Sequence, residues 1–532
     1  MSFIYLGKRD NNKIAALILL VYSMLTRFLT SIHSIIYNKY AIDGDGACFY
    51  VIGKAIMQGK VLYKGIFDHK TPYIYFLNGL ASLLEYNHTG LFLVEVLILF
   101  VTLHFIFKIL ILFFENEKFK NGKLLTEKQL YVISLIGTFI MGIILSDFAI
   151  TEGYYRTEAF AVALIMPAVY IMAKYYYGKI NILKIPKQMF IIGLLAGFTF
   201  MINLKGIVLF VPLVIPLVFD FIKQKQWFGL LKTFCLGLFG VIIAILPYVI
   251  YMIVTDSVKD MIFAVWDTNL AYARDYMEYN IESSSNVIST KDGFLYLIIA
   301  FFIKTPIVMS LIFLSVAIIF LLKYNNTFKI ALCLELLVTF IITLSIGRPH
   351  IYYLYSLLPY AIVIFAFIII FINKIINSLH INFKLPNIVA IILSFVLLLS
   401  IGYGLNNKVV RTTAEKALND AKELQTVAKS YDSNYSRLKV LGIAYIPDIY
   451  LWLDADINYK YFVRPFITYN SFKVAFNEQT NYINNINPDI IVVRNFEFVP
   501  KQLEMQIKFI LNYYYDLIGE TNEYYLYGKI RK

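Results

Sequence analysis

The chain has 532 residues, of which 59% are hydrophobic and only 16% are charged. That is more apolar surface than a soluble fold can bury, so the composition excludes a soluble globular protein and indicates a polytopic α-helical membrane protein. The formal net charge of +13 comes from lysines dispersed in short loops, not from one basic patch with interleaved aromatic residues, and this argues against a nucleic-acid partner.

The first apolar run, residues 14–36, follows the basic residues Lys8, Arg9 and Lys13. It is longer than the apolar core of a cleaved signal peptide and no small-residue cleavage site follows it, so we expect a retained signal anchor. Arg27 lies inside this run. A cation at that depth packs against another span, snorkels to the interface or contacts a ligand.

Apolar runs long enough to cross a bilayer recur along the chain. They predict about eleven membrane-spanning helices, at residues 14–36, 89–114, 129–145, 159–177, 189–203, 205–222, 230–254, 305–322, 330–346, 351–372 and 387–404. The run at 72–86 is too short to span comfortably, and we expect it to form a helix on the membrane surface.

The loops between these spans alternate in charge. Lysines fall after the second, fourth, sixth, eighth and tenth spans, which places those loops and the N-terminus in the cytoplasm under the positive-inside rule. We therefore expect a multi-pass protein of the cell (inner) membrane with its C-terminus outside. The outer face then receives residues 37–88, 146–158, 203–205, 255–304, 347–350 and the tail from about 405.

The tail after residue 405 changes character. Residues 409–431, 471–485 and 500–514 have helical patterns, and β-branched or aromatic runs at 438–443, 461–466, 489–494 and 524–530 predict strands. The sequence therefore predicts two domains, a transmembrane domain at 1–404 and a small extracytoplasmic α/β domain at 405–532.

Two acidic residues, Asp43 and Asp45, follow the first span on either side of a glycine. Asp and Gly favour turns, so one interpretation is a turn that ends the span. The other is chemical, because a carboxylate at the mouth of a cavity can act as a general base or as a ligand for a hard cation. The residues that follow on the same loop favour the chemical interpretation.

Asp68, His69 and Lys70 come immediately before Pro72 and a predicted helix. A lysine near a helix N-terminus can hold a lipid phosphate, with help from the helix dipole. The alternative is a lysine that snorkels to the interface beside a histidine at the surface. We expect Lys70 to belong to a site.

Further charges lie at other predicted outer loops. Arg156 and Glu158 stand where the fourth span begins, either as a buried ion pair between spans or with Glu158 orienting an acceptor hydroxyl or stabilising a developing cation. Lys205 lies between two spans, where most lysines are snorkelling anchors. Arg348 and His350 precede two tyrosines, and a guanidinium beside an imidazole matches phosphate oxygens.

In combination these stretches resemble the GT-C superfamily of membrane glycosyltransferases, in the branch of the protein O-mannosyltransferases and lipid A aminoarabinose transferase. The resemblance rests on DGACFYVIGK at 45–54, FDHKTP at 67–72 and TEAF at 157–160, with weaker support from KG at 205–206 and HIYYLYSLLP at 350–359. The order of the stretches is similar to that in the family. As architecture the resemblance covers residues 1–405.

The resemblance implies an enzyme that moves a sugar from a polyprenyl-phosphate donor to a hydroxyl acceptor, on a cell-envelope glycan, a glycolipid or a protein, at the external face. It implies Asp45 as the catalytic acid-base residue, which makes Asp43 the second choice, and Glu158 as the second external acidic residue. Lys70 takes the position of a polyprenyl-phosphate contact. The other residues expected to bind donor phosphate or lipid are His69, Asp68, Arg156, Lys205, Arg348, His350 and Tyr352.

The sequence departs from the family pattern at Thr71, where a glycine is usual, and at Ala159, where a second glutamate is frequent. The second departure leaves metal use open, and a divalent cation, Mg or Mn, would be held by Asp45 and Glu158. The three cysteines are isolated, and no HExxH motif or Ser/His/Asp order with a nucleophile elbow is present. These absences disfavour zinc enzymes and hydrolases.

The alternative function is a transporter or flippase of lipid-linked saccharides, which would use the same cations to hold phosphate. It predicts charges distributed through the spans and an inverted repeat with broken helices. The charges instead gather on one predicted face and no repeat is visible, so the sequence favours the enzyme. Residues 255–304 are then expected to order over the site as a lid.

Overall fold

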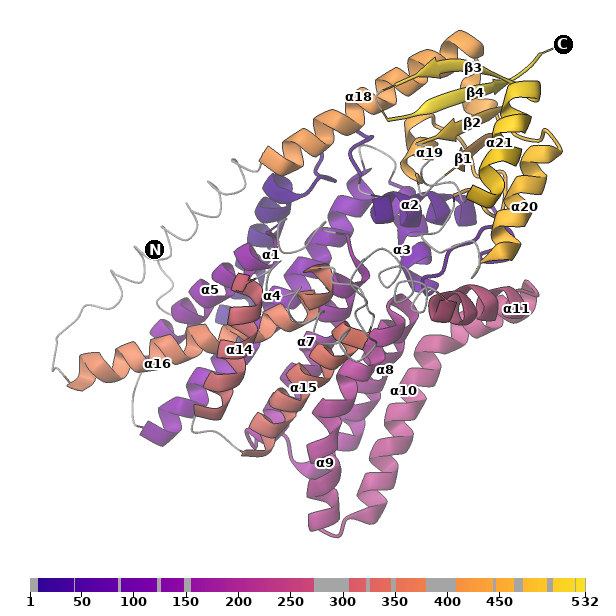
Figure 1. Ribbon diagram of the computed structural model, residues 1–532. Coiled ribbons are helices and arrows are strands. Elements are labelled where there is room, and N and C mark those ends of the chain that lie inside the picture. Colours follow the sequence, from indigo (N-terminus) through magenta and orange to yellow (C-terminus); the bar gives the residue numbers. More distant parts are fainter. Residues whose placement is uncertain are drawn as a thin grey trace, which may run out of the picture. The chain divides into compact units, whose positions relative to one another are not determined.

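The computed structural model divides the chain into two compact units, each built from segments far apart in the sequence (Figure 1). Unit 1 comprises Met1–Ser31, Leu93–Pro247 and Phe294–Asn407, and unit 2 comprises Ile32–Phe92, Tyr248–Gly293 and Lys408–Lys532. The structure describes residues 8–42, 44–84, 88–121, 126–147, 155–271, 306–321, 326–345, 351–378, 408–443, 446–463, 472–494, 501–521 and 523–531.

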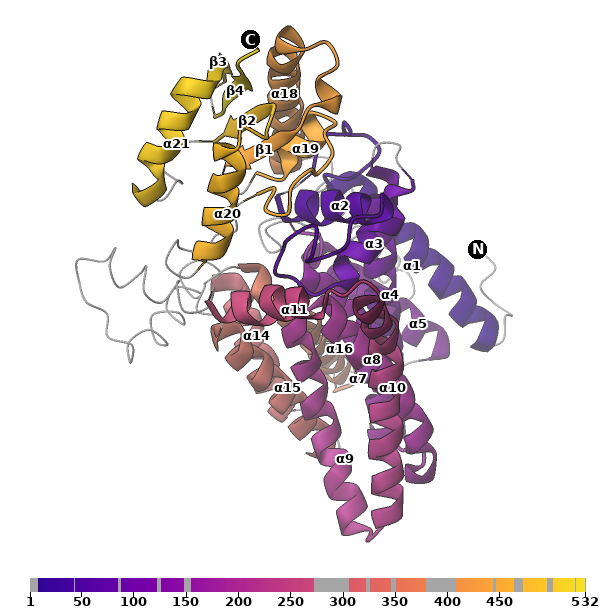
Figure 2. The ribbon, with the colours of Figure 1, turned by 90° about the vertical axis from the view of Figure 1, so that its right-hand side faces the viewer.

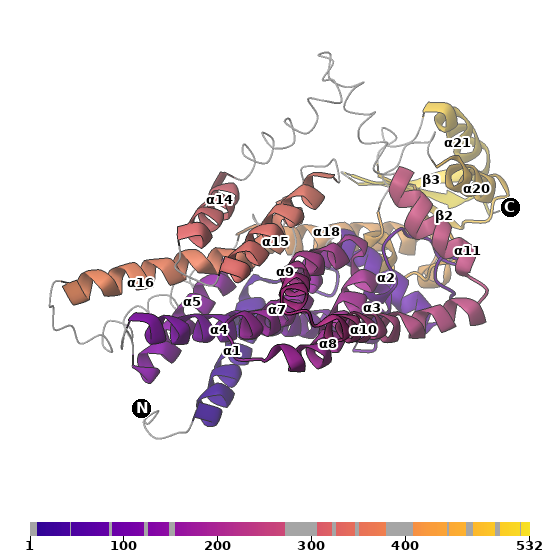
Figure 3. The ribbon, with the colours of Figure 1, turned by 90° about the horizontal axis from the view of Figure 1, so that it is seen from below.

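Unit 1 is helical throughout its described residues. Its helices are α1 (Lys8–Thr30), α4 (Thr89–Asn121, apart from its first turn), α5 (Glu127–Ile144), α7 (Thr157–Tyr176), η2 (Ile182–Lys184), α8 (Ile185–Ile202), η3 (Leu204–Phe210), α9 (Val211–Lys223), α10 (Trp227–Val254, apart from its last turns), α14 (Pro306–Leu321), α15 (Asn326–Ser345), η5 (Ile351–Ala361) and α16 (Ile362–Ser378). Helices α14, α15 and α16 lie together, as Figure 3 shows from below.

Among the described residues, seven helices are long and apolar enough to cross a membrane. They are Asn11–Thr30, Thr89–Asn116, Thr157–Tyr176, Ile182–Ile202, Leu204–Lys223, Trp227–Val254 and Tyr352–Phe371. Two shorter apolar helices, Gln129–Ile144 and Met309–Ile319, also coincide with predicted spans. The chain is therefore a multi-pass membrane protein. The predicted span at 387–404 lies outside the described residues, and the number of eleven spans stays a prediction.

Arg27 in α1 is 1% exposed and lies within unit 1. It is close enough to the hydroxyl group of Tyr355 in η5 to form a hydrogen bond, and the buried carboxylate of Glu95 in α4 lies near the same tyrosine. Intramembrane charges are expensive unless they meet partners of this kind. Arg27 thus packs against other helices, which was one of the roles expected for it.

Helices α8 and α10 pack closely because small residues face each other (Figure 2). A Cβ atom added at Gly193 of α8 would lie 1.9 Å from the carbonyl oxygen of Gly237 in α10. One added at Gly240 would lie 2.2 Å from the carbonyl oxygen of Phe190. Small residues let membrane helices approach backbone to backbone, and such contacts replace the hydrophobic effect inside a bilayer.

The Gly193→Ala substitution is expected to destabilise unit 1, because the added methyl group meets backbone that cannot move aside without separating the two helices. Overpacking of a close contact costs about 1–3 kcal/mol. The matched control is Gly237→Ala, whose added Cβ meets nothing closer than 3.7 Å. The measurement is the thermal unfolding midpoint in detergent, and equal midpoints for the two variants would contradict this account of the contact.

Unit 2 combines the first loop, the segment after α10 and the tail. Its helices are α2 (Gly44–Met57), α3 (Tyr73–Ser82), α11 (Val258–Met261), the π-helix η4 (Ile262–Asp267), α18 (Lys408–Tyr431), η6 (Tyr435–Arg437), α19 (Asp448–Trp452), α20 (Lys473–Asn484) and α21 (Lys501–Tyr514). The short helix predicted near 72–86 is α3. Helix α3 belongs to this unit, where it packs on α2.

The described part of the tail contains a four-stranded sheet in the order β1-β2-β4-β3. The strands are β1 (Val440–Ile443), β2 (Ile490–Val493), β3 (Tyr515–Glu520) and β4 (Tyr525–Lys529). Strand β1 pairs in parallel with β2, and the other two pairings are antiparallel. Helices α18 and α19 lie on one face of the sheet and α20 and α21 on the other (Figure 2). Strands β2 and β4 form its centre, and β1, although all four of its residues are buried, lies at one edge.

Three of the four predicted strands are present and the fourth prediction is wrong. Residues 461–463 form a bend and not a strand, while 464–466 lie outside the described residues. The remaining strand is instead β3, which follows α21 without a break. The predicted tail helices correspond to α18, α20 and α21. That this segment is a separate extracytoplasmic domain stays a prediction.

His88 is a buried histidine at the end of the first loop, 5% exposed, with a φ of 56°. Its ring meets those of Tyr50 and His33 edge to face, at centroid distances of 5.3 and 6.3 Å. Burial, together with the smaller effects of the nearby His33 and Lys39, lowers the pKa of His88 to about 3. The imidazole therefore stays neutral in the folded protein at pH values where it would be charged in an unfolded chain.

Acidification is expected to destabilise unit 2 through His88. A histidine whose folded pKa is lowered binds fewer protons than the unfolded chain between about pH 6.5 and pH 3, so stability falls as pH falls through that window. Between pH 7 and pH 5 the expected loss is about 2 kcal/mol. The variant His88→Asn, which tolerates the positive φ, should show a flatter dependence of thermal midpoint on pH. An unchanged slope would show that His88 is not the group responsible.

Candidate active site

The first loop of unit 2 is fixed by a close crossing of α2 and α3. A Cβ atom at Gly53 of α2 would lie 2.4 Å from the backbone nitrogen of Gly79 in α3, so only glycine permits this approach. The loop that joins the two helices carries the predicted motif at residues 67–72. The end of this loop, which carries Asp68, is thereby placed against the side of α2 that bears Asp45 and Cys48.

Asp68 is buried within this loop, and both of its oxygens are engaged. Oδ2 accepts hydrogen bonds from the Tyr75 hydroxyl at 2.6 Å and from the Cys48 thiol at 3.7 Å. Oδ1 accepts the backbone N–H of His69 at 2.7 Å. Burial raises the pKa of Asp68, but His69, Lys70 and the Tyr75 hydrogen bond together outweigh it and hold the pKa well below its usual range. The carboxylate is therefore charged and turned inward.

His69 connects Asp68 to Lys70. Its Nδ1 lies 3.0 Å from Asp68 Oδ1, without the alignment of a linear hydrogen bond, and its Nε2 lies 3.3 Å from Lys70 Nζ. Burial lowers the pKa of His69. The charge of Lys70 lowers this pKa further, whereas Asp68 and Asp45 raise it. The net lowering keeps the imidazole neutral near pH 7, so its Nε2 can accept a hydrogen bond from the Lys70 ammonium group.

The backbone on both sides of Lys70 is held by buried groups. The Tyr63 hydroxyl donates to the carbonyl oxygen of Lys70 at 2.6 Å, and the backbone N–H of Lys70 donates to the Tyr75 hydroxyl at 3.2 Å. Asn269 donates through Nδ2 to the carbonyl oxygen of His69 at 2.7 Å. Ordering of this kind fixes the direction in which the half-buried Lys70 side chain leaves the loop.

Asp45 stands in the first turn of α2 and is half-buried. An acidic residue there is favoured by the helix dipole. Its charge acts on His69, so the two side chains are within electrostatic reach. The structure thus brings Asp45, Asp68, His69 and Lys70 together, while the predicted Asp43 lies outside the described residues.

A second group of predicted residues meets in unit 1, at the start of α7. Arg156 occupies the N-cap position of α7 and Glu158 lies in its first turn. The Thr157 hydroxyl donates to Glu158 Oε2 at 3.1 Å. Asn203, between α8 and η3, donates to Thr157 Oγ1 at 3.3 Å and to Glu158 Oε1 at 3.5 Å. The Glu158 carboxylate is thus held between the start of α7 and the connection from α8 to η3.

The cations of this second group rest on aromatic rings. The Arg156 guanidinium carbon lies 4.9 Å from the ring centre of Tyr352, and Lys205 Nζ lies 5.6 Å from that of Tyr353. The two rings are 4.5 Å apart. Contacts of this geometry are attractive cation–π interactions. They place Arg156, Lys205 and Tyr352 together with Glu158, whereas Arg348 and His350 lie outside the described residues.

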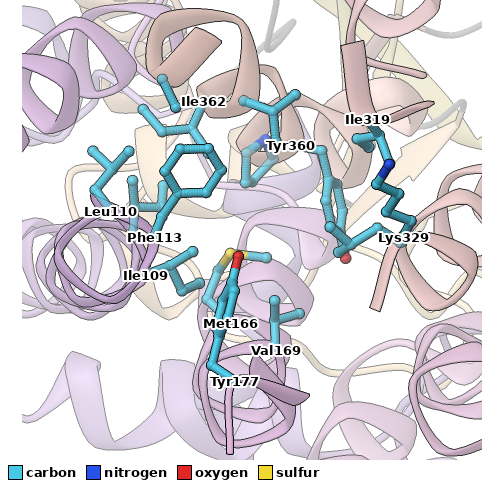
Figure 4. Close-up of a pocket in the computed structure, with 15 residues that line it drawn as sticks. Ile109, Leu110, Phe113, Met166, Val169, Tyr177, Ile319, Lys329, Tyr360 and Ile362 are labelled. Carbon is cyan, nitrogen blue, oxygen red and sulfur yellow. The ribbon is translucent and has the colours of Figure 1, made fainter. Parts of the chain in front are cut away.

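Unit 1 also contains an apolar pocket, shown in Figure 4. Residues of α4, α7, α14, α15, η5 and α16 line it, among them Phe113, Met166 and Ile362, and the polar groups of Tyr177 and Lys329 reach its edge. It extends along α7 from Met166 to Tyr177, roughly 12 to 28 Å along the helix from Glu158 at 1.5 Å per residue. Its walls suit a hydrocarbon chain and not a phosphate group.

The described residues provide no cluster of three His, Cys, Asp or Glu side chains with the arrangement of a metal site. Asp45 lies within electrostatic reach of the His69 imidazole, and Glu158 is hydrogen-bonded to an asparagine and a threonine. Neither set is the all-oxygen, mostly acidic cage that Mg²⁺ or Mn²⁺ prefers. The described donors therefore do not fit a divalent cation, and we derive no step through one.

Sequence reasoning missed four residues that order the two groups. Asn203 had a signal, a lone polar side chain between apolar spans, and Tyr63 and Tyr75 lie inside the conspicuous loop. Asn269 had none, because its contact with His69 spans 200 residues. Comparison of the chain with models of protein families and with curated protein sequences finds no match.

Proposed function

We propose that the protein is a membrane glycosyltransferase, which moves a sugar from a polyprenyl-phosphate donor to a hydroxyl group of a cell-envelope glycan, glycolipid or protein. The observation that carries the proposal is the grouping of Asp45 and Lys70 around one neutral histidine. Such a reaction needs a carboxylate to take a proton and a cation to receive a phosphate, and both are held there on one ordered loop and helix end.

In the proposed reaction the acceptor oxygen forms a bond to the anomeric carbon of the sugar. The bond from that carbon to the phosphate oxygen breaks, and its electron pair stays on the polyprenyl phosphate. The acceptor proton passes to the Asp45 carboxylate, which must lie at hydrogen-bond distance of about 3 Å. Lys70 stabilises the negative charge that develops on the leaving phosphate.

Asp68 and His69 support this step without reacting. Asp68 was expected to bind donor phosphate, but its carboxylate is directed inward and its charge would repel an anion. Its proposed role is to hold His69, and His69 orients the Lys70 ammonium group through Nε2. An ammonium group carries three protons, so one contact with an imidazole nitrogen does not exhaust its capacity to donate.

For the group at the start of α7 we propose a role within unit 1 alone. Arg156 and Lys205 are cations suited to an anionic lipid headgroup, and a guanidinium suits phosphate in particular. Glu158 is held by Asn203 and Thr157 in a fixed orientation, as a group that orients an acceptor hydroxyl must be. The resemblance of TEAF at 157–160 to the glycosyltransferase superfamily supports this assignment.

The test is reconstitution of the full chain in liposomes with polyprenyl-phosphate sugars, polyprenyl-diphosphate sugars and nucleotide sugars, together with a cell-envelope extract as acceptor. We expect sugar transfer and release of polyprenyl phosphate with the monophosphate lipids alone. Movement of the intact donor between leaflets, without release of polyprenyl phosphate, would instead establish the flippase. Transfer from nucleotide sugars would contradict the proposed donor class.

A further inference from the structure

We infer that the C-terminal segment and the π-helix η4 position His69 and Lys70 by clamping Phe67, the residue that precedes Asp68. The inference rests on the proposed function, since the residues being positioned are those assigned to the reaction. It gives the tail a task that the sequence does not indicate, because none of its side chains belongs to the predicted site.

The clamp is built on both the backbone and the ring of Phe67. The backbone N–H of Phe67 donates to the carbonyl oxygen of Lys460 at 2.9 Å. The buried ring meets those of Tyr461 and Phe472 from the tail, both at 5.1 Å, and that of Phe263 from η4 at 6.2 Å. Aromatic pairs at these separations contribute about 0.5–1.5 kcal/mol each beyond their buried area.

The segment of η4 is itself tied to the loop and to the tail. Phe263 stacks on Phe472 at 5.6 Å with an angle of 15° between the rings. Asp260, at the start of the same segment, forms an ion pair with Lys460 at 2.7 Å. One residue after η4 is Thr268, and Asn269 follows with bonds to the carbonyl oxygens of His69 and Val265, both at 2.7 Å.

The π-helix explains why both contacts come from one short segment. A π-helical turn is wider than an α-helical turn, and such turns occur frequently at functional sites. Here it lets Phe263, at its start, face Phe67 while Asn269, just beyond its end, reaches His69. Phe67 and His69 of the loop are thus both held by the short segment that runs from Phe263 to Asn269.

Displacement of Phe67 must displace the reacting groups. His69 and Lys70 follow Phe67 by only two and three residues. Asp68, which lies between Phe67 and His69, is fixed by Tyr75 and Cys48. A misplacement of about 1 Å at a reacting group costs on the order of 10²-fold in rate. Phe472 and Asn269 are therefore positioning residues, which act on the reaction through the loop without touching substrate.

Cys48 offers a measure of this positioning that is independent of catalysis. Its thiol is fully buried and bonded to Asp68, so it becomes reactive only if the loop loosens. The other cysteines, Cys235 and Cys333, are changed to serine so that alkylation reports Cys48 alone. In this background we compare Phe472→Ala and Asn269→Ala with Phe509→Ala, which removes an exposed ring from α21 in the same unit.

We expect Phe472→Ala and Asn269→Ala to raise the rate of Cys48 alkylation at least tenfold and Phe509→Ala to leave it unchanged. In preparations that transfer sugar, kcat should fall tenfold or more in the first two variants with little change in KM for the donor, and Phe472→Tyr should restore it. Unchanged alkylation in both clamp variants overturns the inference, as does a loss confined to KM.

The two proposals fail in distinguishable ways. If the wild-type chain turns over no donor, the proposed glycosyltransferase function is wrong. Faster Cys48 alkylation in the clamp variants would still support positioning of the loop. Only variants that elute from gel filtration like the wild type are compared. If Phe472→Ala does not pass this criterion, Asn269→Ser, which removes one side-chain amide and no ring, decides the outcome.

Discussion

Replacement of Asp45 by asparagine is expected to lower kcat for sugar transfer by about 10²–10⁴-fold, the range that a general base contributes. The amide has the shape of the carboxylate but cannot accept the acceptor proton. KM for the donor should change little, because the lost interaction is made with the acceptor proton in the transition state and not with the bound lipid. Steady-state transfer in liposomes measures both quantities.

The matched control for this prediction is Asp256→Asn. Asp256 belongs to the same unit, its side chain is 98% exposed, and among the described residues its ion pair is with the exposed Lys64. Its φ of 50° is one that asparagine adopts readily. We expect wild-type transfer from this variant. If the Asp45→Asn protein also transferred sugar at the wild-type rate, the assignment of the base would be wrong.

Replacement of Lys70 by methionine is expected to lower kcat by about 10²–10³-fold, comparable with the removal of one donor to a developing oxyanion. Methionine keeps most of the apolar stem and loses the charge, so packing against the loop should persist. The effect arises because negative charge on the phosphate increases as the glycosidic bond breaks. Single-turnover rates with saturating donor separate this loss from a loss of binding.

Lys64→Met provides the control for Lys70→Met. It removes the same charge from the same loop, at a side chain that is 46% exposed and whose partners, within the described part of the chain, are groups at 255–256. Exposed pairs of this kind contribute little, so we expect wild-type rates. A variant Lys70→Met that raised KM and left kcat intact would show that the lysine binds ground state and transition state equally.

Hydrophobic pattern predicted most of the helices and failed where the local pattern was ambiguous. Residues 461–466 are aromatic and β-branched, as strands are, but Tyr461 is used as one wall of the Phe67 clamp and the chain bends there. Strand β3 was missed because it begins at the residue after α21 and carries a register shift between Leu517 and Gly519. Tertiary context decided both cases.

The candidate site was predictable where residue type carries the chemistry. Ionisable residues are expensive to place at membrane depth, so Asp45, Lys70 and Glu158, near the ends of apolar runs, were conspicuous. The residues that hold the site in place were not predictable. The hydrogen bond from Phe67, for example, goes to the backbone carbonyl group of Lys460, and every residue has such a group. Asn269 and Phe472 likewise lie far along the chain, and their proximity to the loop follows only from the folded structure.

The bond between Phe67 and Lys460 has a consequence for biosynthesis. About 390 residues separate the two partners, and at 5–20 residues per second the ribosome needs roughly 20–80 s to make them. Throughout that interval the part of the clamp that comes from the tail is absent. The nascent loop is therefore open to proteases and chaperones. The last step of maturation is the docking of the newly made tail onto a loop that was synthesised early in translation.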